Sequence, residues 1–444
     1  MTLTSISFGL VFLPLAVLAV WGTPPSWRQR TLLVLSLAFF LLAEPWSLPM
    51  AITSILLDFG AVRLMAQKGS DRRWRRFCMW FSVIKNIIML AVSGALQQLY
   101  GAGMPFGLVV YTLTAMAAVV DMYKEEIPCE TDLGRFALTC LFFPKMFAGP
   151  LVEYRQFSLQ MGDIRLKGAK RMWGLGQYIH GMAKNAVIAV ALQKIYLSIC
   201  GFQTADITVL STWSMVLALA FTTYFSLSGF SDMAVGLGRV FGLELPKNFY
   251  YPYQARTVED FFDRFNITVS AFVRKYVYFN LDADQNGVIA TCLNLLVVGL
   301  LTGLWFGLRI NYMLWGAYLA AFIMMEKFLF PKVFDFIPTL FSRIYAFCVV
   351  LSSFTIFAGD SLTQTGIFIR RMFGFGGVGL YNTKILYLLS SNWLILVISC
   401  FFATNMADLI MTWLRKTAPR LSQMIMAVVD FGILCYVAAL LLTA

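Results

Sequence analysis

The feature that most constrains this chain is a succession of long apolar runs that contain few charged residues. The first 120 residues alone contain such runs at 8–21, 31–43, 48–65, 77–96 and 105–120. A helix of roughly 20 apolar residues crosses the hydrocarbon core of a bilayer, so these runs predict membrane-crossing helices. Composition excludes a soluble fold, because only 13% of the residues are charged and 59% are hydrophobic, whereas a soluble surface needs far more charge.

The same pattern continues towards the C-terminus. Further runs lie at 174–199, 209–241, 288–307, 313–330, 344–358, 385–404 and 424–442. Together the runs predict an all-α polytopic membrane protein with about 11–12 transmembrane helices, packed as one membrane-embedded domain over the whole chain.

The segment 121–174 breaks this pattern. Pro144, Gly149 and Pro150 interrupt an apolar run that is too short to cross a membrane. Irregular backbone at membrane depth must be shielded by protein. We therefore expect a re-entrant or interfacial segment here.

Basic residues follow alternate apolar runs, which indicates the orientation of the chain. Arg28 and Arg30 follow the first run, and a dense basic cluster at 63–76 follows the third. The positive-inside rule places the Gln67–Arg76 loop in the cytoplasm and the N-terminus outside. The net charge of +12 then reflects loops beside anionic lipid, and not a nucleic-acid partner. We expect a multi-pass protein of the cytoplasmic (inner) membrane whose first run is a retained helix.

Known catalytic and metal-binding motifs are absent from the sequence. The chain has one histidine, His180, and its eight cysteines are scattered singly without a CxxC pair. It contains no nucleotide-binding loop and no serine–histidine–aspartate pattern. We expect no metal site and no bound cofactor.

One helical stretch, Thr257–Leu281, is much more polar than the others. Thr257 is a suitable helix N-cap. Asp263, Asn266, Ser270 and Arg274 step by three, four and four residues, which places them on one helical stripe. Two interpretations stay open. The stretch is either an amphipathic helix at the membrane interface or a helix that lines a polar cavity in the protein.

A second polar position lies inside an apolar run. Asp232 stands in SLSGFSDMAVGLG, a segment rich in small residues that allow close helix contact. An intramembrane carboxylate is costly and is a functional candidate. The alternatives are a hydrogen bond to Ser226, Ser228 or Ser231, or a location near the interface.

Five stretches of the sequence then point to one known family. They are FFPKMFAGPLVEYRQF (142–157), SGFSDMAVGLGRVFGLELPKNFYYPY (228–253), FFDRFNITVSAFVRKYVY (261–278), LTGLWFGLRINYMLWGAY (301–318) and FAGDSLTQTGIFIRRMFG (357–374). In this order they resemble the membrane-bound O-acyltransferase (MBOAT) family. The most similar branch is that of bacterial alginate O-acetyltransferases and teichoic-acid D-alanyl transferases.

The resemblance implies two catalytic positions, and this chain departs from the branch at both. The branch has a Trp-His pair where this chain has Phe265-Asn266, and a second histidine where GLWFG has Phe306. In the family, a histidine there is thought to take the proton of the acceptor hydroxyl as it attacks a thioester. Phenyl and neutral amide groups cannot accept this proton. Asp263 or Asp232 could act as a substitute base if burial raised the pKa of its carboxyl group.

The resemblance also implies a central cavity with substrate-binding residues. Around the two family positions these would be Arg264, Ser270, Arg274 and Trp305. The donor would be an acyl thioester, either acyl-CoA or an acyl-carrier protein.

Two functions follow from the resemblance. The first is acyl transfer, such as O-acetylation, from a cytoplasmic thioester to a cell-surface polysaccharide or envelope polymer. Its partners would be membrane lipid, a cytoplasmic acyl carrier, and an extracytoplasmic acyltransferase or polysaccharide assembly protein. The alternative is a histidine-less pseudoenzyme that binds, scaffolds or translocates a ligand.

Overall fold

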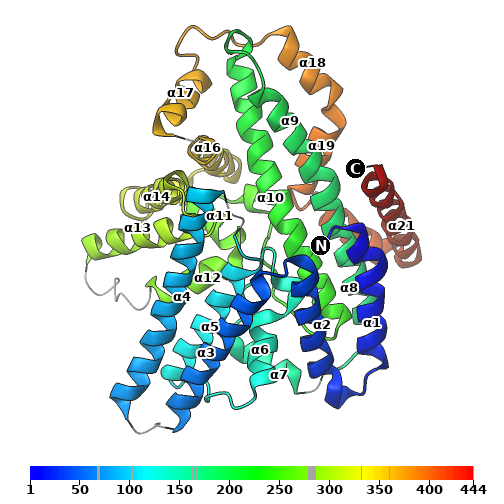
Figure 1. The fold of residues 1–444 in the computed structure, drawn as a ribbon. Helices are drawn as coiled ribbons and strands as arrows, with labels where there is room; N and C mark the ends of the chain where they lie inside the picture. Colours follow the sequence, from blue (N-terminus) through cyan, green and yellow to red (C-terminus); the bar gives the residue numbers. More distant parts are fainter. Residues whose placement is uncertain are drawn as a thin grey trace. The chain divides into compact units, whose positions relative to one another are not determined.

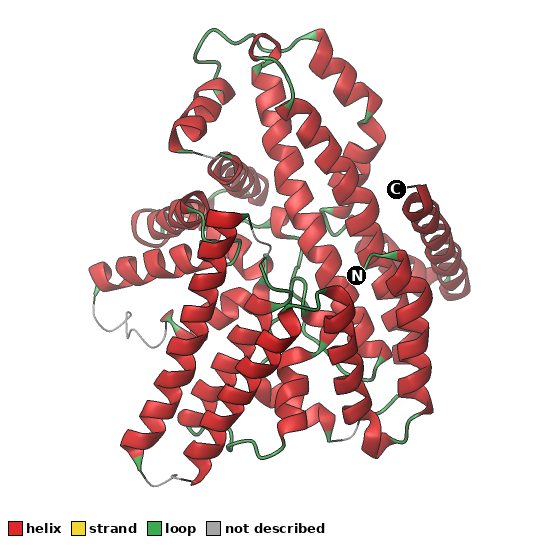
Figure 2. Ribbon diagram, viewed as in Figure 1, coloured by secondary structure: helices red, strands yellow, loops and turns green. Residues whose placement is uncertain are grey.

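A computed structural model describes residues 1–67, 71–101, 104–162, 164–166, 168–278, 287–331, 333–359 and 361–443. Helices form almost all of the regular structure in these ranges, and no β-strand occurs in them (Figures 1 and 2). An isolated antiparallel bridge joins Phe249 and Phe265. The prediction of an all-α membrane fold is confirmed.

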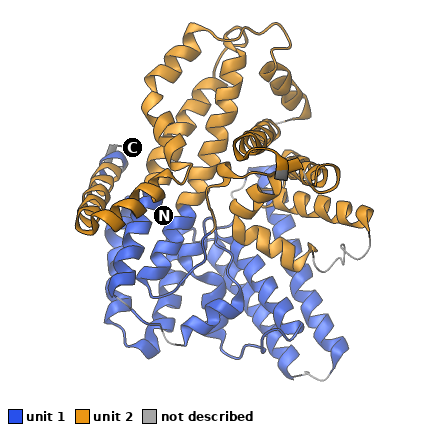
Figure 3. Cartoon of the chain, turned by 180° about the vertical axis from the view of Figure 1, so that it is seen from behind, with its two compact units in different colours: residues 1–182, 230–247, 438–444 blue, residues 183–229, 248–437 orange. Residues whose placement is uncertain are grey.

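The chain divides into two compact units, which Figure 3 shows in different colours. Unit 1 contains Met1–Met182, Phe230–Lys247 and Ala438–Ala444, and unit 2 contains Ala183–Gly229 and Asn248–Val437. The expectation of one membrane-embedded domain over residues 1–444 stays a prediction.

Unit 1 is built from the N-terminal helices and the last third of a long helix, α10 (Val209–Val240). Its other helices are α1 (Leu13–Gly22), α2 (Arg28–Ala43), α3 (Ser47–Gln67), α4 (Arg72–Tyr100), α5 (Leu108–Tyr123), α6 (Leu133–Leu141), α7 (Tyr154–Met161) and α8 (Gly168–Met182). Helices α6 and α7 are too short to cross a bilayer. The chain between them is buried around Pro144, so protein shields the interruption that the sequence predicts.

An ion pair between a buried aspartate and a partly buried lysine joins α3 to α4 near the middle of both helices. Asp58 is fully buried, and its carboxylate lies 2.8 Å from the Nζ of Lys85. Ser82 donates to the same carboxylate at 2.6 Å and Asn86 at 3.2 Å. Lys85 also donates to the Oγ of Ser54 at 2.7 Å. Each charge therefore has a set of polar partners, which a buried ion pair in an apolar helix pair requires.

Unit 2 contains the first two thirds of α10 and most of the C-terminal helices. These are α9 (Val190–Cys200), α11 (Val258–Arg264), α12 (Ile267–Tyr276), α13 (Val288–Leu304), α14 (Ile310–Met324), α15 (Val333–Phe336), α16 (Thr339–Ala358), α17 (Leu362–Met372), α18 (Thr383–Ser391), α19 (Trp393–Phe402), α20 (Met406–Thr417) and α21 (Pro419–Thr443), the last of which ends in unit 1.

Helices α13 and α14 approach closely because glycines line their contact. A Cβ atom on Gly303 would lie 2.1 Å from the carbonyl oxygen of Tyr312, and one on Gly316 would lie 1.9 Å from that of Gly299. Only residues without a side chain fit at such a contact. The glycines therefore set the position of the GLWFG turn that follows α13.

Six helices among the described residues are long and apolar enough to cross a membrane. They are Ser47–Gln67, Arg72–Tyr100, Gly168–Cys200, Val209–Val240, Thr339–Ala358 and Pro419–Leu440. The pair α18 and α19, bent by 63°, would make a seventh span. Phe8–Gly22, Leu108–Tyr123 and Val288–Leu304 are shorter apolar helices. The multi-pass character is thus confirmed, and the total of about 11–12 crossings stays a prediction.

Candidate functional site

The polar stretch that the sequence predicts as one helix is broken in two. Helix α11 ends at Arg264 and α12 begins at Ile267, whereas residues 279–286, which include the end of the predicted stretch, lie outside the described part of the chain. At the break, Asn266 adopts a left-handed conformation with φ 54° and ψ 52°. Asparagine is one of the few residues other than glycine that visit this region readily. The prediction of one continuous helix is therefore wrong.

Two acceptors hold the N-terminus of α11. Thr257 accepts a hydrogen bond from the N–H of Asp260 at 3.0 Å, which confirms the predicted N-cap. The second acceptor is the buried carboxylate of Glu326, which follows α14. It accepts from the N–H groups of Val258 at 2.8 Å and Glu259 at 3.3 Å. A carboxylate at this end also interacts favourably with the helix dipole.

Sequence reasoning missed Glu326, although a signal was present. This glutamate lies inside the apolar run 313–330. An acidic residue in such a run needs a partner within the protein. Its partner is the start of α11, 67 and 68 residues away in the sequence, which a local pattern does not reveal.

Three buried polar residues surround the break. Asn248 donates from Nδ2 to the Oδ1 of Asn266 at 2.8 Å. The Oδ1 of Asn248 accepts from the backbone N–H of Thr268 at 2.9 Å and from its hydroxyl at 2.8 Å. The backbone of Asn248 also accepts from the N–H of Ile267 at 2.8 Å. These contacts hold the break in place. They also give the buried amide groups hydrogen-bond partners, without which their removal from water would be costly.

The second family position, Phe306, lies in an aromatic cluster. Its ring centroid is 5.4 Å from that of Trp315 and 5.2 Å from that of Phe357, and both contacts are edge-to-face. The Trp315 indole N–H donates to Ser353 at 2.9 Å. On α11, Phe262 lies 6.3 Å from the same Trp315 ring. Trp315 therefore connects the helix before the break with the turn that carries Phe306.

The four residues that the sequence places on one polar stripe lie in different environments. Asp263 and Arg274 form an ion pair at 2.9 Å, and each side chain is about half exposed. Ser270 donates to the carbonyl oxygen of Phe262 at 3.1 Å, and Asn266 is buried. The break rotates α12 relative to α11, so the expected single stripe does not form. Asp263 does not meet the condition of burial on which its role as substitute base depended.

The other predicted site residues show no common arrangement. Arg264 pairs with Asp260 on its own helix, and Trp305 is half-buried beside Phe306. Asp232 belongs to unit 1, where it is half-buried and accepts from Gln177 of α8 at 3.4 Å. Gln177, which is not among the serines considered from the sequence, is therefore a partner of Asp232.

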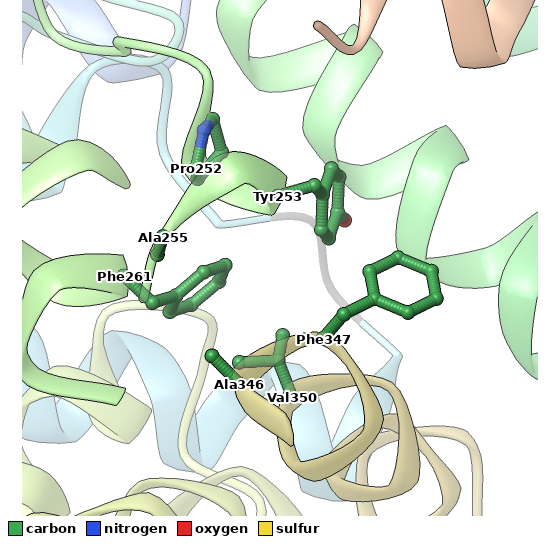
Figure 4. Close-up of a pocket in the computed structure, with 7 residues that line it drawn as sticks. All are labelled: Pro252, Tyr253, Ala255, Phe261, Ala346, Phe347 and Val350. Carbon is green, nitrogen blue, oxygen red and sulfur yellow. The ribbon is translucent and has the colours of Figure 1, made fainter. Parts of the chain in front are cut away.

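The hollow beside α11 is apolar and too narrow for a water molecule (Figure 4). It is lined by Pro252, Tyr253, Ala255, Phe261, Ala346, Phe347 and Val350. The hydroxyl of Tyr253 donates to the carbonyl oxygen of Ala220 at 2.7 Å. The polar cavity around Asp263, Asn266, Ser270 and Arg274 thus stays a prediction. Within the described ranges no group of three or more metal-ligating side chains occurs.

Fold and site together define a polytopic membrane protein in which a broken helix carries a buried asparagine cluster beside an aromatic cluster. The sequence profile of the membrane-bound O-acyltransferase family matches residues 131–369, more than half of the chain and the part that contains both clusters. The chain belongs to this family.

Several curated proteins are similar to this chain over much of its length. A probable alginate O-acetylase AlgI of Pseudomonas fluorescens is 27% identical over 383 residues, which cover 85% of this chain and 76% of the relative. A peptidoglycan O-acetyltransferase of Helicobacter pylori is 23% identical over 83% of this chain and 78% of the relative. A teichoic acid D-alanyltransferase of Bacillus subtilis is 23% identical over 55% of this chain and 65% of the relative. The matches to some relatives cover little more than half of their length, as with the AlgI protein of Pseudomonas syringae pv. tomato, of which 52% is covered.

Proposed function

We propose that this protein transfers an acyl group from a thioester donor to a hydroxyl group of a cell-surface or envelope polymer. The observation that carries the proposal is the buried asparagine cluster at the broken helix. Asn266, at a family catalytic position, is held there by Asn248 and Thr268 in a left-handed conformation. Residues other than glycine that the surrounding structure holds in the left-handed region cluster at active sites and ligand-binding sites.

The relatives suggest the type of donor and acceptor. Their names describe acetylation of alginate or peptidoglycan and D-alanylation of teichoic acid. We infer a donor of the acyl-CoA or acyl-carrier-protein type on the cytoplasmic side and an acceptor polymer outside. In the same scheme the protein lies in the cytoplasmic membrane with its N-terminus outside, and an extracytoplasmic acyltransferase or polymer assembly protein is its partner.

The expected rate follows from the side chains at the two family positions. Neither Asn266 nor Phe306 can accept the proton of an attacking hydroxyl. A general base typically contributes about 10²–10⁴-fold to a rate. We therefore expect slow transfer by the isolated protein. Faster transfer requires that the acceptor or a partner protein supplies the base.

The test is single-turnover consumption of acetyl-CoA by the purified protein in lipid nanodiscs, with an O-deacetylated envelope polysaccharide as acceptor. We expect transfer that Asn266→Ala abolishes and that Asp263→Asn leaves unchanged, because Asp263 is exposed and paired with Arg274. Loss of transfer in Asp263→Asn would instead assign the base to that carboxylate. Ligand binding without consumption of any thioester would refute the proposal in favour of the pseudoenzyme alternative.

A further inference from the structure

The orientation of the Asn248 side-chain amide is determined by a backbone group. The backbone N–H of Thr268 can only donate, and it lies 2.9 Å from one terminal atom of the Asn248 amide. That atom must therefore be the oxygen. The other terminal atom of Asn248 is consequently the nitrogen, which carries two N–H donors.

This orientation passes to the neighbouring amide. The Nδ2 of Asn248 lies 2.8 Å from a terminal atom of Asn266. Two amide nitrogens facing each other cannot form a hydrogen bond, so the facing atom of Asn266 is its oxygen. The direction of this contact thus follows from a backbone N–H two residues beyond Asn266.

The remaining end of Asn266 is a free donor. Asn266 is 94% buried as a residue, since its exposed fraction is 6%. No described residue accepts from its Nδ2, and this nitrogen is not among the fully enclosed polar atoms that lack a partner. The amide is therefore nearly buried, but its N–H₂ group is unpaired and still reaches the surface. Such a group can donate a hydrogen bond to an oxygen atom of a ligand.

We infer that Asn248 is a positioning residue that holds the Asn266 side chain as a hydrogen-bond donor to the acyl carbonyl oxygen of the thioester. This inference rests on the proposed function. In the transfer step, the acceptor hydroxyl oxygen forms a bond to the carbonyl carbon and the C–S bond breaks. The hydroxyl proton ends on the leaving sulfur, so the products are an ester and a thiol. The N–H₂ group of Asn266 stabilises the negative charge that develops on the carbonyl oxygen between these events.

The direction of the Asn266 amide decides whether the residue helps or hinders the reaction. A rotation by 180° would present its oxygen to the carbonyl oxygen and replace attraction by repulsion. Removal of one donor to a developing oxyanion typically lowers turnover about 10²–10³-fold. Asn248 would therefore affect the reaction strongly without contacting the substrate.

The variant Asn248→Asp tests this role directly. A carboxylate keeps both acceptor contacts with Thr268 but cannot donate to Asn266, whose amide is then expected to rotate. Asn266→Asp is a second variant, which keeps the donor on Asn248 and replaces the free N–H₂ group with an oxygen. Asn382→Asp is the matched control. Asn382 also accepts from a backbone N–H, that of Ile385 at 3.0 Å, and donates to a backbone oxygen, that of Asp206 at 2.8 Å.

The readout is the ratio of the affinities for two probes, acetyl-CoA and S-ethyl-CoA, in which a methylene replaces the carbonyl. We expect the wild type and Asn382→Asp to bind acetyl-CoA about two- to tenfold more tightly, the value of one neutral hydrogen bond. In Asn248→Asp and Asn266→Asp this preference should disappear. If Asn248 had a purely structural role, Asn248→Asp would weaken the binding of both probes equally and leave the ratio of their affinities unchanged.

The outcomes separate the two proposals. A preference for acetyl-CoA that survives in Asn248→Asp overturns the inference, as does equal affinity of the wild type for both probes, and neither result affects acyl transfer itself. Binding of neither probe by the wild type, together with no acetyl-CoA consumption, overturns the proposed function and with it the inference. Unfolding temperatures of all variants in detergent show whether each retains its fold.

Discussion

Replacement of Phe306 by histidine tests whether an imidazole at the second family position can act as a base. The Phe306 ring makes edge-to-face contacts with Trp315 and Phe357, and each such aromatic pair contributes about 0.5–1.5 kcal/mol. The indole N–H of Trp315 already donates to Ser353. An imidazole nitrogen that lies in this cluster without a hydrogen-bond partner lowers the free energy of unfolding by about 1–3 kcal/mol, in addition to the loss of the aromatic contacts.

We therefore expect Phe306→His to destabilise the protein by about 2–6 kcal/mol, the sum of two lost aromatic pairs and one unpaired polar group. Because the imidazole enters an apolar cluster, transfer should rise by no more than a few-fold. The measurements are thermal unfolding in detergent and single-turnover transfer from acetyl-CoA, with Phe306→Leu as an apolar control. If Phe306→His unfolds at the wild-type temperature and accelerates transfer by about 100-fold, the low end for a general base, the reasoning is wrong.

Three further predictions concern stability and topology. Glu326→Gln removes the charge that holds the start of α11. We expect the free energy of unfolding to fall by about 1–3 kcal/mol, measured by thermal unfolding, whereas Glu259→Gln should have little effect because Glu259 is exposed. Asp58→Asn leaves the partly buried ammonium of Lys85 without its counter-ion and should lower the free energy of unfolding by up to about 3 kcal/mol, the low end for a fully buried pair; an unfolding temperature equal to that of the wild type would contradict this. A cysteine at Ser70, which lies outside the described residues, should resist a membrane-impermeant thiol reagent in intact cells, whereas one at Gln98, at the other end of α4, should react. Strong labelling at position 70 alone would reverse the orientation.

The membrane class and the positions of the long helices could be read from the sequence. The apolar run 209–241 corresponds to α10, Val209–Val240, and the run 77–96 lies inside α4, Arg72–Tyr100. In a bilayer every backbone group must be satisfied within the segment, so a long apolar run has few alternatives to a helix. The Thr257 cap was also predictable, because its acceptor and donor are only three residues apart.

The break at Asn266 and the environment of Phe306 could not be predicted in this way. The residues from Thr257 onwards have a regular helical spacing, yet contacts from outside the stretch interrupt it. Asn248 binds Asn266 and Thr268 from 18 and 20 residues upstream, and Glu326 binds the start of α11 from 68 residues downstream.

Local spacing thus determined which segments are helical and which polar residues are candidates for a functional site, because helix formation depends on neighbours within one or two turns. The tertiary structure alone decided that Asp263 is exposed in an ion pair, that the partly buried Phe306 ring packs against two other aromatic rings, and that the Asn266 amide presents its N–H₂ group. Each of these properties depends on hydrogen bonds and contacts between side chains of different helices and turns, and only the packed chain brings those side chains together.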